Sequence, residues 1–210
     1  MNLFMEFLRR TFCFLFLACT TATPLSAPSA ITATTSTSII SPSKTVLAPP
    51  LTNAVARITK KTFGLFVDPT HSPISPERFR GYHTGDDLET TSDETKSDTP
   101  VSAACEGKLL VKKWASGYGG IAVESCILDE TSVTVIYGHL RLSSIKPAIG
   151  STLKQGETFA LLGTGYSTET DGERKHLHFA IHRGTTINIL GYVQDKTSLT
   201  QWMDPLPLLK

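Results

Sequence analysis

The sequence predicts a mainly β fold in which an antiparallel sheet forms most of a single domain. Three observations support this prediction. The chain of 210 residues contains 15 glycines and 12 prolines, which suits a loop-rich β architecture better than a helix bundle. Short apolar, β-branched runs are separated by residues that favour turns. Helical periodicity is weak along the whole chain.

The expected strands lie in the second half of the chain. Residues 108–115 (KLLVKKWA) and 120–128 (GIAVESCIL) are joined by a glycine-rich turn, so we expect them to pair in antiparallel fashion. Residues 131–140 (TSVTVIYGHL) are rich in β-branched and aromatic side chains. Residues 149–165 contain four glycines around a short apolar strand, and residues 175–184 (KHLHFAIHRG) alternate with a period of two.

The N-terminal residues 1–22 have the layout of a secretory signal peptide: two arginines, a short apolar run and then small residues. The apolar run is too short to cross a bilayer, which takes roughly 20 apolar residues. Residues 16–19 (FLAC) also resemble a lipoprotein box, so membrane attachment is expected only if Cys19 is lipidated. Residues 23–54, rich in Ser, Thr, Ala and Pro, are expected to be a disordered linker before a domain at 55–210. We therefore expect a monomeric protein that is secreted or resides in the periplasm or cell envelope.

Charge and cysteine content restrict the function further. The chain carries 20 Lys and Arg against 19 Asp and Glu, which gives no basic character to indicate nucleic-acid binding. Cys105 and Cys126 flank the turn between two expected strands, and an oxidising compartment would allow a disulfide there. Two buried thiols are the alternative. Neither cysteine lies in a CxxC pattern, which argues against a cysteine zinc site.

Two histidines lie on one face of an expected strand. Alternate side chains of a strand share a face, so His176 and His178 project together, with Cα atoms roughly 7 Å apart. Leu177, Phe179 and Ile181 take the opposite face, which has the character of a core. The pair therefore indicates either a metal or catalytic site, or two structural histidines.

The segment at residues 81–89 (GYHTGDDLE) contains a second candidate pair. In a straight strand His83 and Asp87 would share a face but lie roughly 13 Å apart, too far to bind one ion. A bend at Gly85 would bring them together, because glycine has the required backbone freedom. Asp86 is a rival carboxylate that an odd offset directs elsewhere. A surface turn is the alternative explanation.

Together these residues form a recognised type of zinc site. Two histidines and an aspartate are a standard catalytic zinc set with one position open for water. The sequence contains no HExxH motif, so no glutamate on a helix is available as the general base. Other histidines, including His139 at the end of the strand at residues 131–140, are the natural substitutes.

The motifs GYHTGDD, YGHL and HLHF, in this order within a glycine-punctuated β domain, resemble the lysostaphin/LytM-type zinc peptidoglycan endopeptidases. The resemblance extends over about residues 60–205 and includes the segments TFGLFVDP, SGYGGIAV and GSTLKQGETFALLGTG. It implies a largely antiparallel sheet with a groove that carries one zinc ion. It also implies three zinc ligands and two catalytic histidines: His83, Asp87 and His178 as ligands, and His139 and His176 as the catalytic pair.

The resemblance implies a function as well. A zinc-activated water would attack a peptide bond of bacterial peptidoglycan, in a crosslink or a stem peptide, with His139 or His176 as general base and oxyanion stabiliser. The approach to HLHF, GTGYSTETDGERK, is longer than is usual in the family, so substrate choice is open. Two alternatives remain: a non-catalytic protein of this fold that binds peptidoglycan or activates a hydrolase, and a disulfide-bridged adhesion or glycan-binding domain.

Overall fold

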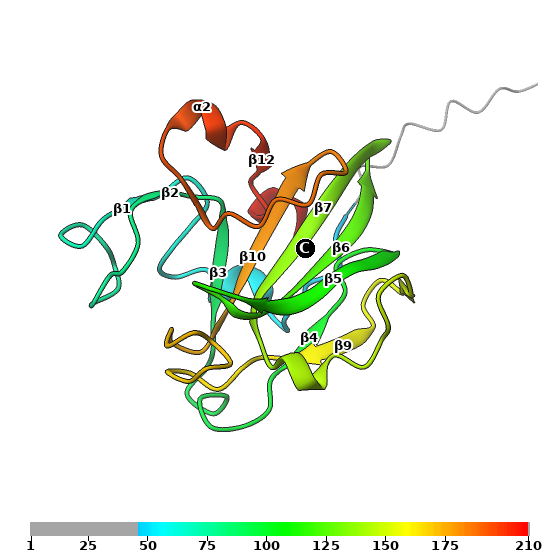
Figure 1. Cartoon of the computed structure of the whole chain (residues 1–210), viewed down its shortest axis with the longest axis horizontal. Helices are drawn as coiled ribbons and strands as arrows, with labels where there is room; N and C mark the ends of the chain where they lie inside the picture. Colours follow the sequence, from blue (N-terminus) through cyan, green and yellow to red (C-terminus); the bar gives the residue numbers. More distant parts are fainter. Residues whose placement is uncertain (1–45, 210) are drawn as a thin grey trace, which may run out of the picture. The chain divides into compact units, whose positions relative to one another are not determined.

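The structure is a computed structural model that describes residues 46–209 (Figure 1). The expected signal peptide and most of the expected linker lie outside the described residues. Residues 46–54, which were expected to belong to the linker, pack on the domain. Leu47, Leu51 and Ala54 are buried in the core, and the N–H of Leu47 donates to the carbonyl of Leu208 at 3.0 Å. Residues 46–54 therefore belong to the folded domain, because these apolar side chains fill space beside the C-terminal residues.

Short strands dominate the described part of the chain. Its helices are two single turns, α1 (Ala54–Arg57) and α2 (Lys196–Leu199), and two 3-10 turns, η1 (Leu142–Ser144) and η2 (Leu206–Leu208). None of the helices in residues 46–209 has the length and apolar character that a membrane crossing needs. The strands are β1 (Phe66–Val67), β2 (Gly81–His83), β3 (Gly85–Glu89), β4 (Pro100–Ser102), β5 (Gly107–Ala115), β6 (Gly119–Leu128), β7 (Thr131–Leu140), β8 (Thr152–Leu153), β9 (Thr158–Leu161), β10 (His176–Arg183), β11 (Tyr192–Val193) and β12 (Trp202–Met203).

The strands form three antiparallel sheets within residues 46–209. The main sheet has the order β12-β10-β7-β6-β5-β8, and β3 pairs with β10 as well. Figure 1 shows the neighbouring ribbons of β3, β10, β7, β6 and β5. A second sheet has the order β1-β2-β11, and β4 and β9 form the third. The mainly antiparallel β fold is as expected, and two small sheets accompany the main one. The chain leaves one sheet for another at Thr84, whose N–H and hydroxyl donate to the carbonyls of Gly191 and Leu190 at 3.0 and 2.7 Å.

Strand β10 is paired on both of its edges within the main sheet and has two distinct faces. On one face Leu177, Phe179 and Ile181 are fully buried in the main hydrophobic core. On the other face are His176 and His178, as the alternation of the sequence predicted. Because β10 pairs with both β3 and β7, residues from these two strands lie next to the two histidines.

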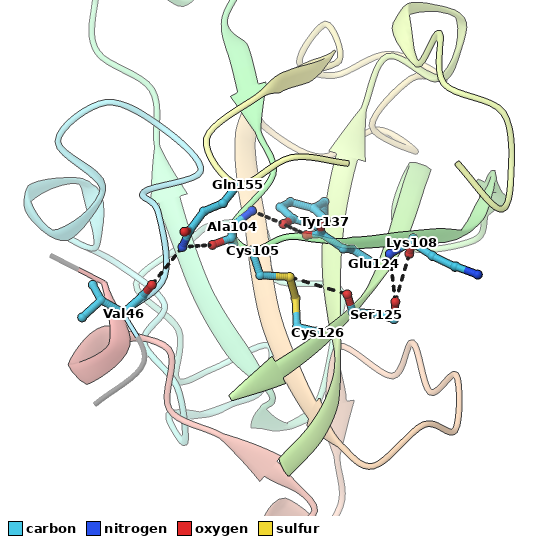
Figure 2. The surroundings of a disulfide bond; sticks show 9 residues. All are labelled: Val46, Ala104, Cys105, Lys108, Glu124, Ser125, Cys126, Tyr137 and Gln155. Atoms are coloured by element: carbon cyan, nitrogen blue, oxygen red, sulfur yellow. Dashed lines mark hydrogen bonds between the residues drawn. A yellow bond between two sulfur atoms is a disulfide. The ribbon is translucent and has the colours of Figure 1, made fainter. Parts of the chain in front are cut away.

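The expected disulfide is present in the structure and lies beside a buried carboxyl group (Figure 2). Cys105 precedes β5 and is bonded to Cys126 on β6. Tyr137 donates its hydroxyl to Oε2 of Glu124 at 2.6 Å and accepts the N–H of Ala104 at 2.7 Å. Burial raises the pKa of Glu124 to about 7, against the opposing effect of the hydrogen bond from Tyr137.

Candidate metal centre

Three side chains from three strands converge at one end of β10. His83 ends β2, Asp87 lies in β3 and His178 lies in β10 directly opposite Asp87. His83 Nε2 lies 3.0 Å from His178 Nδ1, His178 Nδ1 lies 3.2 Å from Asp87 Oδ1, and His83 Nε2 lies 3.3 Å from the same oxygen. Each of the three residues is at most 3% exposed. In the sequence, His83 and Asp87 formed one candidate pair and His176 and His178 another. The structure brings the two pairs together.

The approach of His83 to Asp87 has a different cause from the one expected. The chain changes sheets between them, so they do not lie on one straight strand. Gly85 contributes close packing: a Cβ atom there would lie 2.3 Å from the carbonyl oxygen of Phe179 on β10. The rival carboxylate of Asp86 accepts the N–H of Phe63 at 2.8 Å and takes no part in the cluster. Burial raises the pKa of Asp86 to about 6.

The three converging atoms suit a cation. The Nδ1 atom of His83 lies 3.3 Å from the carbonyl of Thr62, which can only accept a proton, so Nε2 presents a lone pair. Burial lowers the pKa of His178 to about 4, although its hydrogen bond with Asp87 opposes this, so the imidazole is neutral. A tetrahedral zinc site with bonds of about 2.0–2.2 Å places its ligand atoms about 3.3–3.6 Å apart. The observed separations are close to this, and two imidazoles with a carboxylate fit zinc.

The second oxygen of Asp87 faces other groups. Its Oδ2 atom lies 2.9 Å from Nη2 of Arg174 and 3.3 Å from Nε2 of His176. Burial alone would raise the pKa of Asp87, but the imidazoles of His176 and His83 outweigh burial and hold that pKa well below its usual range. Asp87 is therefore a carboxylate, with one oxygen toward the histidine pair and one toward Arg174.

His139 and His176 form a second pair beside the three converging residues. Their ring centroids lie 4.3 Å apart, and both residues are at most 4% exposed. His139, at the end of β7, has a φ of 63°, which is uncommon for a residue other than glycine. The N–H of Gly163 donates a hydrogen bond to the carbonyl of His139 at 2.8 Å. Burial lowers the pKa of His139 well below its usual value, with the neighbouring His176 acting in the same direction, so it is a neutral imidazole that can accept a proton.

Comparison with known proteins identifies the family. Residues 81–189, just over half of the chain, match the model of peptidase family M23, and this segment contains all five residues. The chain belongs to peptidase family M23. A comparison with curated proteins gives no match.

Solved structures of known proteins share the fold of this M23 domain. CbpA from L. salivarius REN is 20% identical, with 79% of this chain and 94% of that chain covered and a TM-score of 0.50. A structure of the SpoIIQ–SpoIIIAH pore-forming complex is 15% identical over 80% of this chain and 93% of that chain, with a TM-score of 0.52. A structure of LytU is 23% identical over 72% of this chain and 82% of that chain, with a TM-score of 0.49. At these identities the likeness concerns the fold alone.

The centre of this M23 domain lies at a cavity of about 400 Å³. Lys61, Tyr118 and Tyr192 are among the residues of its wall that were not singled out from the sequence. Lys61 forms a buried ion pair with Glu77 at 2.6 Å and donates to the hydroxyl of Tyr192 at 2.9 Å. Tyr118 belongs to the turn SGYGG, and its ring lies 5.3 Å from that of His178. The turn motif pointed to this region, whereas no local pattern marked Lys61 or Tyr192.

The long approach to HLHF links two other segments that edge the cavity. Glu173 accepts from Nε of Arg78 at 2.8 Å, and Asp171 accepts the N–H of Gly117 at 2.7 Å. Arg78 belongs to the segment between β1 and β2, and Gly117 to the turn between β5 and β6. The charged residues of this approach therefore connect the walls of the cavity.

A second group of metal-binding residue types is not part of the lining of this cavity. Cys105, Glu124 and Cys126 have potential ligand atoms within 4.8 Å of one another. The two sulfur atoms are bonded to each other, however, so neither is a thiolate that could bind an ion. This group is a disulfide beside a buried carboxyl group.

Proposed function

We propose that this M23 domain is a zinc metallo-endopeptidase that hydrolyses peptide bonds in bacterial peptidoglycan. The convergence of His83 Nε2, Asp87 Oδ1 and His178 Nδ1 at 3.0–3.3 Å is the observation that carries the proposal. Each of the three atoms can offer a lone pair, and one cation between them would satisfy all three at once. The export expected from residues 1–22 would deliver such an enzyme to the cell wall.

The residues of the centre have complementary roles in this reaction. His83, Asp87 and His178 would hold the ion, which when bound would polarise the scissile carbonyl and lower the pKa of water to about 7. His139 and His176 line the cavity as imidazoles that lie next to the ligands. One accepts the proton of the attacking water and returns it to the leaving amine, and the other donates to the developing oxyanion.

The lining of the cavity supports a peptide as substrate. Its wall combines the rings of Phe79, Tyr118 and Tyr192 with the side chains of Ile189 and Leu190. A few charged groups interrupt this apolar surface, as is typical of sites that bind and orient small substrates. A crosslink or stem peptide of the wall, which combines small apolar side chains with charged groups, suits such a lining.

The test is to measure bound zinc in the purified chain and to incubate it with bacterial sacculi. We expect about one zinc per chain, release of peptide fragments, and loss of release when a chelator is added. A His71→Ala variant is the matched control, because the ring of His71 is 79% exposed and lies outside the cavity. Zinc without cleavage would instead favour a peptidoglycan-binding or hydrolase-activating role. A folded chain that binds no zinc would refute the proposal that the protein is a zinc enzyme.

A further inference from the structure

Arg174 connects the candidate metal centre to the long segment that precedes β10. Its side chain is 9% exposed. The guanidinium donates through Nη2 to Asp87 Oδ2 at 2.9 Å and through Nε to both oxygens of Glu89 at 3.1 and 3.0 Å. Its backbone carbonyl accepts from Nδ1 of His176 at 2.9 Å. One residue therefore touches a candidate zinc ligand with its side chain and a candidate catalytic histidine with its backbone.

The two contacts constrain the centre in different ways. The guanidinium occupies Oδ2 of Asp87 and leaves Oδ1 toward His83 and His178, so the carboxylate presents a single oxygen to the ion. The carbonyl of Arg174 can only accept, so it keeps a proton of His176 on Nδ1, while Nε2 of the same ring lies 3.3 Å from Oδ2 of Asp87.

The charges around Arg174 indicate that it orients the carboxylate of Asp87 and contributes little net charge to the centre. Its positive charge is balanced by Glu89, and Lys60 adds a half-exposed ammonium 3.3 Å from the same carboxylate. The pair of Arg174 and Glu89 is neutral, so it changes the net charge of the centre little. What remains is the direction of the hydrogen bond to Asp87, since a guanidinium presents its donors in a rigid planar fork.

We propose that Arg174 is a positioning residue that holds Asp87 as a ligand through one oxygen and thereby sets the affinity and coordination of the metal. The inference rests on the proposed function only in that the centre binds zinc. Loss of such an outer partner typically weakens metal binding by about 10–100-fold. Without Arg174 the carboxylate can rotate and offer both oxygens, which would raise the coordination number.

The test compares the full-length wild-type chain with the double variant Arg174→Met/Glu89→Gln, which removes the neutral pair together. Zinc affinity is measured by competition with a chromophoric chelator. We expect the double variant to bind zinc about 10–100-fold more weakly. We also expect the visible spectrum of the cobalt-substituted variant to lose intensity, because five-coordinate cobalt absorbs less strongly than tetrahedral cobalt. Arg78→Met is the matched control, since Arg78 pairs with Glu173 at the cavity edge and is expected to leave both readouts unchanged.

A single substitution keeps the test informative if the double variant does not fold. Arg174→Lys retains the charge, but one ammonium cannot reproduce the fork that reaches Asp87 and Glu89 together, so we expect an intermediate loss of zinc affinity. Wild-type affinity and an unchanged cobalt spectrum in either folded variant would overturn the proposal, and so would a wild-type chain that binds no zinc. If the affinities change as expected but sacculi remain intact, the positioning role stands and the proposed hydrolysis fails.

Discussion

The Nε2 atom of His83 lies 3.0 Å from Nδ1 of His178, although 95 positions separate the two residues in the chain. Because the Nδ1 proton of His83 faces the carbonyl of Thr62, the Nε2 atom that meets His178 is an acceptor. Asp87 adds a carboxylate oxygen to the same point. A single proton on His178 cannot satisfy both neighbours, whereas one cation can bind all three atoms.

Removal of one converging residue should abolish tight zinc binding. Loss of a residue that only contacts a ligand weakens metal binding by about 10–100-fold. For His178→Ala or Asp87→Asn, which remove a ligand itself, we expect the zinc dissociation constant to rise by more than this. In the wild-type chain, zinc at 100 times its dissociation constant should stabilise the fold by about 2.7 kcal/mol, and this gain should vanish in the variants. Chelator competition and thermal melting with and without zinc measure both effects. Wild-type affinity in His178→Ala would exclude His178 as a ligand.

The catalytic pair should behave differently from the ligands. His139→Ala and His176→Ala each remove a group that moves a proton or donates to the oxyanion, so we expect the cleavage rate to fall by about 10²–10⁴-fold. Zinc content should remain at the wild-type level, because neither residue belongs to the converging group. Fragment release from sacculi, normalised to bound zinc, separates the two effects. Loss of zinc in both variants would show that these histidines support the site and do not act in the chemistry.

Local pattern and family resemblance predicted much of the site. The two-residue period of HLHF placed its histidines on one face, and the motif order brought His83, Asp87 and His139 to them. The contribution of Arg174 depends on a loop that returns its side chain to Asp87, and no spacing rule predicts that contact. The break at Thr84 was missed for a similar reason: it depends on hydrogen bonds to the carbonyls of residues 190 and 191, which are distant in sequence.

The position of Gly85, next to the candidate metal centre, should tolerate no side chain. In Gly85→Ala the new Cβ would meet the carbonyl oxygen of Phe179 at 2.3 Å, and a backbone atom in a central strand cannot move aside. We expect β3 to shift away from β10, with Asp87, and both stability and zinc affinity to fall. Gly156→Ala is the control: it has a φ of 79° but open space, so it should cost about 1 kcal/mol and leave zinc binding intact. Unfolding curves and chelator competition measure both. Equal effects of the two substitutions would argue against the close contact.

The disulfide should stabilise the domain without serving the metal centre. Cys105 and Cys126 are 21 positions apart, and closing a loop of this length in the unfolded chain is worth about 3 kcal/mol. We expect the Cys105→Ala/Cys126→Ala variant to lose about that much unfolding free energy in denaturant while it retains zinc and cleavage. Wild-type protein measured under reducing conditions should show the same loss. A variant that unfolds at the wild-type denaturant concentration would show that the crosslink adds nothing.

Glu124 should make the stability of the domain depend on pH. Burial raises its pKa from 4.5 to about 7, so between these values the folded protein keeps a proton that the unfolded chain releases. Stability from this group is therefore full below pH 4.5, falls as the pH rises toward 7, and is then constant at a loss of about 3 kcal/mol. Glu124→Gln removes the titration while leaving an oxygen for the hydroxyl of Tyr137. Asp86, whose pKa burial raises to about 6, is present in both proteins and cancels in the comparison. We expect the unfolding free energy of the variant relative to wild type to increase by up to about 3 kcal/mol from pH 4 to pH 8. Parallel pH curves would show that Glu124 ionises as readily in the folded protein as in the unfolded chain.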